Sequence, residues 1–563
     1  MKIKEILIKN FRSVKEEKII FPENWILALV WPNNAWKSNV LKAINNILWD
    51  TRFNWERAEL NDFYNKKKEN TIEIKISFDD GKYVEFKSND SWAKYYDETW
   101  HQIYSTQWSV KDDFPCTYLS ANRDLEKNLQ FRSYELMWKI AKAFNERIWQ
   151  ETKEKLETKF WDIMSEFDNI EWFTDFKSDF SSYYDDLQSD SQYKIKVSFK
   201  AFSPLNYFKT INLLANDTSI DDNYNIDPVE LWEWDKSLIL FALIRSYAKN
   251  FKQVASWILA IEEPEIYLHP QARRHLYQVF NEIVSTSNIQ IIYTTHSPDF
   301  LSTEEFSSIW LVSKDPNEWT KVKIVTEQNL VNFCIQTWVP EAKTNIWNIK
   351  EFYSTTSDFR LNEWFFAKHL ILVEWDTEEM CLPLLFERLW LNYYSSWISV
   401  IWVEGKNQIP KYWRLFKSFN IPISVVIDSD KDWSDSRNIA NCFWCSENDI
   451  ISDIDIIKKI ETEKQKLYIF EKDFETALRK SFSNDSKFEE YESEAKNIIK
   501  PISNTSQKWQ IARFICKRIL ENHEYMPEFL QELYNDIQLS QSSIPVEHGD
   551  IRLNSIESNE LPF

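Results

Sequence analysis

Residues 31–38 read Trp31-Pro-Asn-Asn-Ala-Trp-Lys37-Ser38, which is the spacing of a phosphate-binding loop, GxxxxGK[ST], with tryptophan in place of both glycines. Such a loop wraps backbone N–H groups around phosphates, and its glycines adopt conformations that a side chain forbids. Residues 25–30 before the loop are a buried hydrophobic run, and residues 38–44 after it are amphipathic. The order strand, loop, helix predicts the start of an α/β nucleotide-binding domain, although two indoles in the loop would abolish nucleotide binding.

Tryptophan stands in for glycine throughout the chain. The 563 residues include 3 Gly and 28 Trp, whereas average usage of about 7% would give roughly 39 Gly. Our hypothesis is that most of these tryptophans are glycines, in a genome that reads UGA as glycine but was translated as if UGA meant tryptophan. The alternative is a tryptophan-rich scaffold that has lost its chemistry. Indoles selected for packing would not concentrate at turns and phosphate loops, so we favour the hypothesis.

Length, charge and cysteine content limit the class of protein. A chain of 563 residues is long enough for two to four domains. No apolar run approaches the roughly 20 residues of a membrane helix, and six scattered cysteines fit a reducing cytoplasm, which predicts a cytoplasmic protein. The net charge of −21 argues against a protein that coats polyanions, but not against an acidic nuclease that uses local basic patches and bridging metal ions.

The hydrophobic patterns divide the chain into four regions. We expect a nucleotide-binding domain over 1–340 with a charged helical insertion at about 124–187, a polar linker over 341–362, a second α/β domain over 363–480, and a mainly helical region over 481–563. Within the first domain, residues 71–87 predict a β-hairpin with a type I′ turn around Asp79-Asp80-Gly81.

Three motifs predict nucleotide chemistry in the first domain. With glycine at positions 31 and 36, Lys37 would contact the β- and γ-phosphates and the Ser38 hydroxyl would coordinate Mg²⁺. The strand Ile258–Ile261 ends in Glu262 and Glu263, where one carboxylate would hold Mg²⁺ and the next would orient or deprotonate water. His296 ends a later strand, where it would sense the γ-phosphate. Charged pairs at strand ends are also ordinary solvent-facing residues, and an isolated histidine is usually structural.

These motifs together resemble the ABC-type ATPases, in the branch shared by SMC, RecF and OLD-family proteins. Glu262-Glu-Pro-Glu265 with Leu268-His-Pro270 is similar to their Walker B and D-loop, and Leu231-Trp-Glu-Trp-Asp-Lys-Ser237 to their signature loop. The resemblance implies a dimer of ATPase heads, in which the signature of one protomer contacts ATP bound to the other. It implies the following ATP-binding residues: Asn33, Asn34, Ala35, Trp36, Lys37, Ser38, Asn39, Trp234 and Ser237. It also makes Glu263 and His296 catalytic.

A second acidic constellation follows in the second α/β domain. Glu374 and Glu378 lie four residues apart after the strand that begins at 368, and the strand 423–427 ends in Asp428-Ser-Asp430. Alternate residues at a strand end point to the same side, and four such carboxylates suit one or two Mg²⁺ or Mn²⁺ ions that activate water on a phosphodiester. The alternative is that these acidic residues only solvate the strand ends.

This second pattern resembles the Toprim domain, with Trp375 at its glycine, and the domain order resembles OLD-family endonucleases, including the large subunit of Gabija-type anti-phage systems. The fold implied is α/β: an ABC-type ATPase head with an inserted helical arm, followed by a Toprim (Rossmann-like) domain and a helical C-terminus. The resemblance makes Glu374 catalytic as well as a metal ligand. It also implies weaker acidic candidates, Glu471, Asp473 and Glu475, and a late catalytic lysine, Lys508.

We therefore expect an ATP-binding, ATP-regulated, metal-dependent DNA endonuclease, with defence against foreign DNA implied by the resemblance. The implied cofactors are ATP and Mg²⁺, or Mn²⁺ at the nuclease site. The implied partners are DNA, a second copy of the chain and a helicase. The alternative is a RecF- or SMC-like DNA-repair ATPase without nuclease activity. Two alternatives also stand for ATP, which is either hydrolysed or only sensed.

Overall fold

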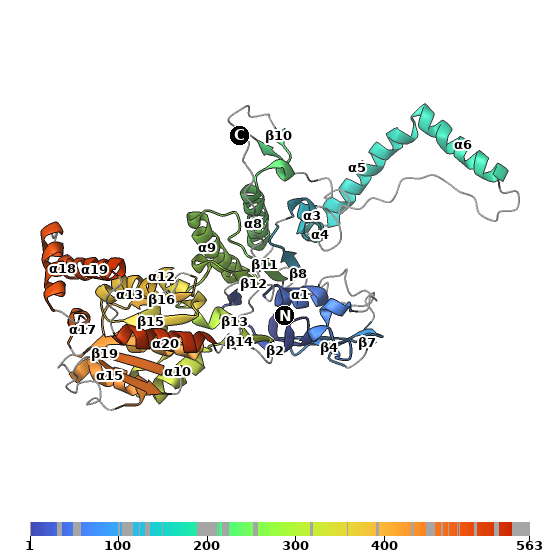
Figure 1. Cartoon of the computed structure of the whole chain (residues 1–563). Helices are drawn as coiled ribbons and strands as arrows, with labels where there is room; N and C mark the ends of the chain where they lie inside the picture. Colours follow the sequence, from blue (N-terminus) through green and yellow to red (C-terminus); the bar gives the residue numbers. More distant parts are fainter. Residues whose placement is uncertain are drawn as a thin grey trace, which may run out of the picture.

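Figure 1 shows the computed structural model of the chain. It describes residues 2–30, 37–48, 58–99, 102–103, 116–122, 124–129, 136–148, 150–187, 211, 213–216, 225–250, 257–315, 319–356, 359–389, 393, 395–429, 433–445, 457–462, 465–470, 472–480, 482, 485–499, 504–522 and 528–542. Within these ranges the chain forms a 12-stranded sheet, a five-stranded sheet and a two-stranded ribbon.

The larger sheet is mixed, with strand order β7-β6-β5-β4-β1-β2-β14-β13-β3-β12-β11-β8. Its strands are β1 (Ile3–Phe11), β2 (Val14–Ile20), β3 (Ile26–Val30), β4 (Ile72–Phe78), β5 (Tyr83–Ser88), β6 (Ala93–Tyr96), β7 (Gln102–Ile103), β8 (Cys116–Leu119), β11 (Trp257–Glu262), β12 (Ile289–Thr295), β13 (Ile309–Asp315) and β14 (Trp319–Ile324). Strands β13, β3, β12, β11 and β8 pair in parallel, and the others pair antiparallel.

The parallel strands form the core of the head. Every residue of β3 and β12 is buried, as expected for parallel strands covered on both faces. Alternate residues of these strands pack against helix α1 (Lys37–Leu48) on one face and helices α8 (Glu233–Asn250) and α9 (Pro270–Thr286) on the other. The predicted strand, loop and helix at the start of the chain are therefore confirmed for the strand and the helix, while residues 31–36 lie outside the described ranges.

The predicted hairpin forms from β4 and β5, but its turn is of a different type. Ser77 pairs with Tyr83, the Phe78 N–H donates to the Lys82 carbonyl at 2.8 Å, and the Gly81 N–H donates to the Phe78 carbonyl at 3.3 Å. In this turn only Gly81 has a positive φ, of 86°. A type I′ turn needs positive φ at both central residues, so the prediction of that type was wrong. The geometry is a three-residue loop with glycine at the left-handed position.

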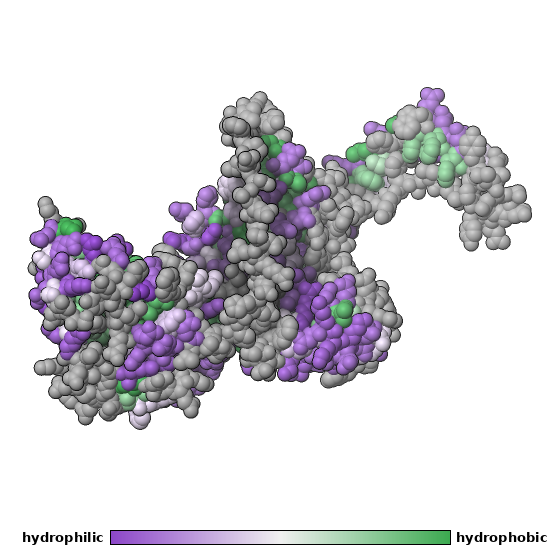
Figure 2. Space-filling view, viewed as in Figure 1, coloured by the Kyte–Doolittle hydropathy of each residue, from purple (hydrophilic) through white to green (hydrophobic). Residues whose placement is uncertain are grey.

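A helical arm leaves the head, as predicted for this charged segment. Its helices are α3 (Leu125–Leu129), α4 (Leu136–Arg147), α5 (Gln150–Asp168) and α6 (Glu171–Leu187). Figure 1 shows α5 and α6 projecting away from both sheets. Several of their apolar side chains are exposed, among them Ile163 at 53% and Phe176 at 54%, and Figure 2 shows hydrophobic surface along the arm.

Helical segments connect the two sheets. They are α10 (Glu327–Gln336), η7 (Glu341–Lys343), α11 (Ile346–Thr356), α12 (Phe359–Glu363) and η8 (Trp364–Phe366), while η5 (Pro298–Phe300) and η6 (Phe306–Ser308) lie between β12 and β13 of the large sheet. The segment 341–362 was predicted as a polar linker, yet it is mostly helical, and its Tyr353 and Leu361 are buried in the core. The domain boundaries themselves stay a prediction.

The second sheet has the order β16-β15-β17-β19-β18 and is parallel except for β18. Its strands are β15 (His369–Val373), β16 (Ile398–Trp402), β17 (Ile423–Asp428), β18 (Ile457–Thr462) and β19 (Gln465–Phe470). Its helices are α13 (Asp376–Arg388), α14 (Ile409–Ser418), α15 (Trp433–Phe443), α17 (Phe474–Lys480), α18 (Asp485–Ile498), α19 (Asn504–Asn522) and α20 (Glu528–Ser542). None of the helices described in the chain has the length and apolar content needed to cross a bilayer.

Two helices end on tryptophans in a conformation typical of glycine. After α10, Trp338 has φ of 63°, its N–H donates to the Ile335 carbonyl, and the Val339 N–H donates to the Cys334 carbonyl. This is the Schellman motif, whose left-handed residue is usually glycine. Trp444 repeats it after α15, with φ of 51° and the Cys445 N–H on the Ala440 carbonyl. An indole gains nothing from this geometry, so both positions agree with the glycine hypothesis.

Candidate functional site: two acidic edges

The parallel arrangement brings the predicted nucleotide residues to one edge of the large sheet. Glu262 is the last residue of β11 and pairs in register with Thr294 of β12, while Thr295 pairs with Val30 of β3. The carboxyl ends of these strands therefore place the start of the phosphate loop, Glu262 and His296 side by side. In open α/β sheets this edge is where ligands bind.

Glu263 and His296 face each other across this edge. The His296 Nε2 atom lies 3.6 Å from Oε1 of Glu263. Glu263 has a positive φ of 44°, although its side chain is not one that favours this region, and its N–H donates to the carbonyl and the hydroxyl of Thr294. Backbone strain of this kind collects at functional sites. Both residues were predicted as catalytic, and the structure brings them into contact.

Glu265 holds the histidine segment in place. Its Oε1 accepts hydrogen bonds from the His296 N–H at 2.6 Å and from the Thr295 hydroxyl at 3.0 Å. Burial raises the pKa of Glu265, and these hydrogen bonds oppose the rise. Any change that moves His296 must therefore also move the Glu265 segment.

The phosphate-loop residues are only partly described. Asn33, Asn34, Ala35 and Trp36 lie outside the described residues, as does the side chain of Lys37, the first residue of α1. Ser38 is half-buried in the first turn of α1. The Asn39 side chain donates to the Ser13 hydroxyl at 3.0 Å and accepts from Arg12 Nη1 at 3.4 Å. The structure therefore links Asn39, which was predicted to bind ATP, to the β1–β2 turn.

The signature residues are placed unequally. Trp232 is 77% exposed and Trp234 is 44% exposed at the start of α8. Ser237, predicted to contact ATP, is fully buried, and its hydroxyl donates to the Glu233 carbonyl at 3.1 Å within the same helix. In this arrangement the hydroxyl satisfies the helix backbone, and its role as a nucleotide contact stays a prediction.

Glu374, Glu378 and Asp428 form the second acidic edge, at the carboxyl ends of β15 and β17. The Asp428 N–H donates to Glu374 Oε2 at 3.2 Å, and both side chains are buried. Burial, and then the charge of Glu374, raise the pKa of Asp428 to about 8. Asp430 lies outside the described residues.

Glu378 is the most informative member of this cluster. It is fully buried in the first turn of α13, and among the described residues no other residue donates a hydrogen bond to either of its carboxylate oxygens. Burial, and then the charge of Asp428, raise the pKa of Glu378 far above its usual range. A buried carboxylate without a donor is costly, and that cost is relieved by protonation or by a cation beside it.

The weaker candidates also come to this edge. Lys508, on α19, has its Nζ 3.0 Å from Glu475 Oε2 and 3.7 Å from Asp473 Oδ2, next to the start of α17. Burial lowers the pKa of Lys508, and its contacts with Glu475 and Asp473 more than reverse this. Glu471 lies outside the described residues. Lys508 is 35 positions from Asp473 and 33 positions from Glu475 in the sequence. All three lie near Asp428 and Glu378, because the charges of Asp473 and Glu475 raise the pKa of Asp428 and the charge of Glu475 raises the pKa of Glu378.

Lys406 was missed from the sequence. It is 5% exposed in the segment after β16, and its Nζ donates to the Asp428 carbonyl at 2.7 Å and lies 3.5 Å from Glu374 Oε2. It therefore contacts two of the predicted metal-binding residues. The available signal was Gly405-Lys406 after a buried strand, since Gly405 has φ of 112° and turns the chain back toward the sheet.

A divalent cation fits the donor set but is not enclosed by it. No three of the described acidic, histidine or cysteine side chains converge closely enough to form a complete metal site. Glu378, Asp428 and Glu475 have buried carboxylate oxygens that accept no hydrogen bond from the described residues. The charges of Asp428 and Glu475 both raise the pKa of Glu378, so the three side chains lie near one another at this edge. Hard oxygen ligands of this kind suit Mg²⁺ or Mn²⁺, which keep several waters and need few carboxylates.

Two known families match the chain, one over the part that contains each acidic edge. Residues 1–111 and 98–301 match the family described as AAA ATPase domain. Residues 365–430, which contain Glu374, Glu378, Asp428 and Asp430, match the overcoming lysogenization defect protein-like TOPRIM domain. The chain belongs to the OLD family of ATPase–Toprim nucleases.

Relatives of this OLD-family chain are named as nucleases. An OLD nuclease of Thermus scotoductus is 24% identical over 460 residues, which cover 76% of this chain and 82% of that protein. The endonuclease GajA of Bacillus cereus is 24% identical over 269 residues, 44% of this chain and 37% of that one. The Old nuclease of Escherichia phage P2 is 24% identical over 242 residues, 42% of this chain and 39% of that one. The predicted family, fold class and enzyme class are confirmed.

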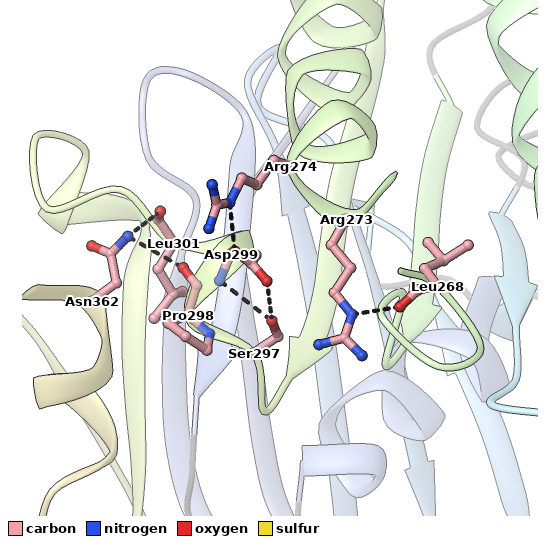
Figure 3. A network of polar contacts seen from close by, with 8 residues as sticks. All are labelled: Leu268, Arg273, Arg274, Ser297, Pro298, Asp299, Leu301 and Asn362. Atoms are coloured by element: carbon pink, nitrogen blue, oxygen red, sulfur yellow. Dashed lines mark hydrogen bonds and ion pairs between the residues drawn. The ribbon is translucent and has the colours of Figure 1, made fainter. Parts of the chain in front are cut away.

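A hydrogen-bond network joins the two edges of this OLD-family chain (Figure 3). Asn362 of α12 is buried, and its Nδ2 donates to the carbonyls of Leu301 at 2.8 Å and Pro298 at 3.2 Å. Its Oδ1 accepts from the Thr303 hydroxyl at 2.8 Å. Residues 298–303 directly follow His296, and α12 directly precedes η8 and β15, so one side chain ties the histidine segment to the strand that carries Glu374.

Proposed function

We propose that this chain is an ATP-regulated, divalent-metal-dependent DNA endonuclease. The observation that carries the proposal is the buried carboxylate cluster of Glu374, Glu378 and Asp428 at the ends of β15 and β17, with Glu378 lacking a donor from another described residue. Burying these carboxylates together is costly, and either protonation or a bound cation relieves that cost. The family match assigns the same segment to a Toprim domain.

Mg²⁺ or Mn²⁺ would be held by Glu374, Glu378, Asp428 and Asp430. When bound, such an ion supplies an activated water and stabilises charge on a phosphodiester oxygen. Asp473 and Glu475 hold Lys508 beside this edge. In that position its ammonium group would bind a phosphate oxygen of the DNA strand and orient it toward Glu374.

ATP would bind at the first edge, with glycine at positions 31 and 36. The backbone of residues 33–36 would then surround the phosphates, Lys37 would contact them, and Ser38 and Glu262 would hold Mg²⁺. Glu263 and His296, 3.6 Å apart, would orient the attacking water and sense the γ-phosphate. The positive φ of four described tryptophans, at positions 25, 338, 397 and 444, supports the reading of these indoles as glycines.

The remaining parts of the proposal concern partners and setting. The ATPase head of a second copy of the chain would dock head to tail across ATP, with the exposed start of α8 near Trp232 and Trp234 facing the nucleotide of the other protomer. A helicase partner and a cytoplasmic site of action, in defence against phage DNA, are what the resemblance to Gabija-type systems implies, and the relatives named endonuclease GajA and Old nuclease support the nuclease activity. The RecF- or SMC-like alternative without cleavage is not favoured, because the chain matches a Toprim domain and its relatives are named as nucleases.

Nicking of supercoiled plasmid tests the proposal directly. Wild type, made with glycine at the UGA-encoded positions, should nick with Mg²⁺ or Mn²⁺, while Asp428→Asn and Glu378→Gln should lose activity by about 10²-fold or more, as expected when a metal ligand is removed. Glu490→Gln, at an exposed position of α18, is the matched control and should nick like wild type. Absence of metal-dependent nicking in the wild type would instead favour the non-cleaving ATPase.

A further inference from the structure

A pocket of about 240 Å³ lies beside the Toprim edge, between the connecting helices and α14. The C-terminal end of α10, helix α11 and the first half of α14 form its walls, and Asn407 closes it. Asn407 directly follows Lys406, which contacts Glu374 and the Asp428 carbonyl. The pocket is therefore the opposite side of the same short segment that supports the metal-binding carboxylates.

The charge of the pocket is opposite to that of the whole chain. Lys343, Lys411 and Arg414 line it, and none of its described lining residues is acidic, although the net charge of the chain is −21. Asn348, Asn407 and Asn438 add amide groups that can donate hydrogen bonds. Three like charges in one hollow repel one another, and a chain so rich in Asp and Glu had acids available to neutralise them.

Hydrogen bonds to Thr337 hold the guanidinium group of Arg414 in one orientation. Its side chain is 6% exposed, Nε donates to the Thr337 hydroxyl at 2.6 Å, and Nη2 donates to the Thr337 carbonyl at 3.3 Å. Thr337 ends α10 and precedes the left-handed Trp338, so the arginine is braced by a helix cap. A buried guanidinium held on one side by a helix end offers its remaining N–H groups to a ligand in a fixed geometry.

Lys411 faces the same hollow from the next turn of α14. Its Nζ lies 4.0 Å from the centre of the Phe352 ring and donates to Gln408 Oε1 at 2.9 Å. Burial, and then the positive charges of Lys343 and Arg414, lower the pKa of Lys411. Neither neighbour supplies negative charge, and none of the described acidic residues lines the pocket beside these cations.

We propose that this pocket binds a phosphate group, which belongs either to a DNA strand that leaves the Toprim edge or to a free nucleotide. The oxygens of a phosphate group can accept hydrogen bonds from arginine, lysine and amide side chains together. Its negative charge would also neutralise the three cations at once. The pocket is too small for a duplex and suits one phosphate with part of its sugar or base against Phe352. The DNA source rests on the proposed function, whereas the phosphate chemistry does not.

Binding assays on the full chain test the site without cleavage. The background is Lys37→Ala, which removes nucleotide binding at the head, and EDTA is present so that no metal supports nicking. The probes are a short single-stranded oligonucleotide with a 5′-phosphate, followed by fluorescence anisotropy, and ATP and inorganic phosphate, followed by calorimetry. The test variant is Lys343→Gln with Lys411→Gln, and the control is Lys417→Gln, which removes one charge from α14 outside the pocket.

The expected result is at least a tenfold loss of affinity in the double variant and less than twofold in the control, because two charge-assisted hydrogen bonds are removed. The slope of log affinity against log salt should also fall by about one for the oligonucleotide. Loss for the oligonucleotide alone assigns the site to DNA, and loss for ATP assigns it to a nucleotide. Equal binding by the double variant and the control, or no binding of any probe by the background protein, overturns the proposal.

Thermal unfolding shows whether the variants are folded, so that a loss of binding can be assigned to the pocket. Lys343 and Lys411 are both exposed, so their replacement should leave the thermal unfolding midpoint within about 2 °C of the control. The charge reversal Lys411→Glu is a second variant, which should weaken binding further than the neutral change. Restored binding in Lys411→Glu would contradict a phosphate ligand.

Discussion

At the scale of single residues, backbone conformation separates positions that need glycine from positions that only tolerate an indole. Trp25, Trp338, Trp397 and Trp444 have positive φ, as do both glycines that the structure describes. The sequence could predict that tryptophan replaces glycine in motifs, because motif spacing is local. It could not predict Trp338 or Trp444, because a Schellman cap becomes visible only when the helix end is known.

Replacing Trp338 by glycine should therefore stabilise the protein. An L-residue in the left-handed region costs about 1–2 kcal/mol, so Trp338→Gly should raise the free energy of unfolding by about 1 kcal/mol in urea titrations. Trp347→Gly is the matched control, since Trp347 is also exposed, at 68%, but lies within α11. Glycine there should give no gain. Equal effects of the two changes would mean that the backbone at 338 is not strained.

Lys406 illustrates a residue that sequence reasoning cannot find by type, because lysines are usually exposed and its burial depends on how β16 and β17 pack. Removing its charge takes away the ammonium group that lies 3.5 Å from Glu374 Oε2. Breaking a buried pair in this way costs about 3–5 kcal/mol. Lys406→Met should therefore unfold at a lower temperature in EDTA.

The same variant should regain more stability from Mn²⁺ than the wild type does, because the cation replaces the missing charge. Thermal unfolding in EDTA and in Mn²⁺ measures the difference, and Lys417→Met on α14 serves as the control. A purely structural lysine would leave the gain from Mn²⁺ unchanged, and that result would contradict the assignment.

At the scale of elements, the sequence was most informative where strands are buried on both faces. The runs that became β3, β11, β12, β15 and β17 are continuous and apolar, so their existence and their acidic ends could be predicted. The helical content of 341–362 could not, because few of its side chains are buried and its polar composition conceals them. The burial of Ser237 depends on how α8 packs and likewise has no local signal.

Strand β15 makes a prediction about pH. His369 at its start is 3% exposed, with Nε2 3.0 Å from the Ser424 hydroxyl. Burial, and then the charge of Lys466, lower the pKa of His369 to about 4, against the opposing charge of Asp536. Below the ordinary pKa of about 6.5 the unfolded chain binds a proton that the folded chain excludes. The folded state therefore loses stability between about pH 6.5 and pH 4, and none of this loss occurs above pH 6.5.

Urea unfolding of wild type and His369→Gln at pH 7.5 and pH 5 measures this effect. The wild type should lose about 2 kcal/mol more than the variant between the two values, since 1.5 pH units correspond to about 2 kcal/mol. The variant serves as its own control for every other titrating group in the chain. Parallel losses in the two proteins would show that His369 is not held neutral.

At the scale of the whole molecule, the two acidic edges are physically joined. Asn362 satisfies the carbonyls of Pro298 and Leu301 and the hydroxyl of Thr303, and it lies between the segment after His296 and the strand before Glu374. Arg274 and Asp299, 3.0 Å apart, attach the same segment to α9 (Figure 3). A two-site effect requires an element whose arrangement both sites can change, and residues 297–303, which contact both α9 and α12, are the candidate for that element.

Asn362→Ala should uncouple the two activities. ATP binding and metal-dependent nicking without ATP should stay within about twofold of wild type, while the change that ATP causes in nicking should shrink by at least half. Stability should fall by about 1–3 kcal/mol, because three buried polar groups lose their partner. Asn332→Ala, on the exposed face of α10, is the control. An intact ATP response in Asn362→Ala would exclude this route.

The left-handed conformation of Trp25 has a consequence outside the folded protein. Trp25 is the first tryptophan of the chain, with φ of 59°, and it precedes β3. If its codon is UGA, a ribosome that reads UGA as stop releases the nascent peptide after Asn24, before the phosphate loop has been made. The gene would then be silent in any cell that uses the standard code, and a recipient could acquire its DNA without acquiring the enzyme. Heterologous production would need every such codon rewritten as a glycine codon.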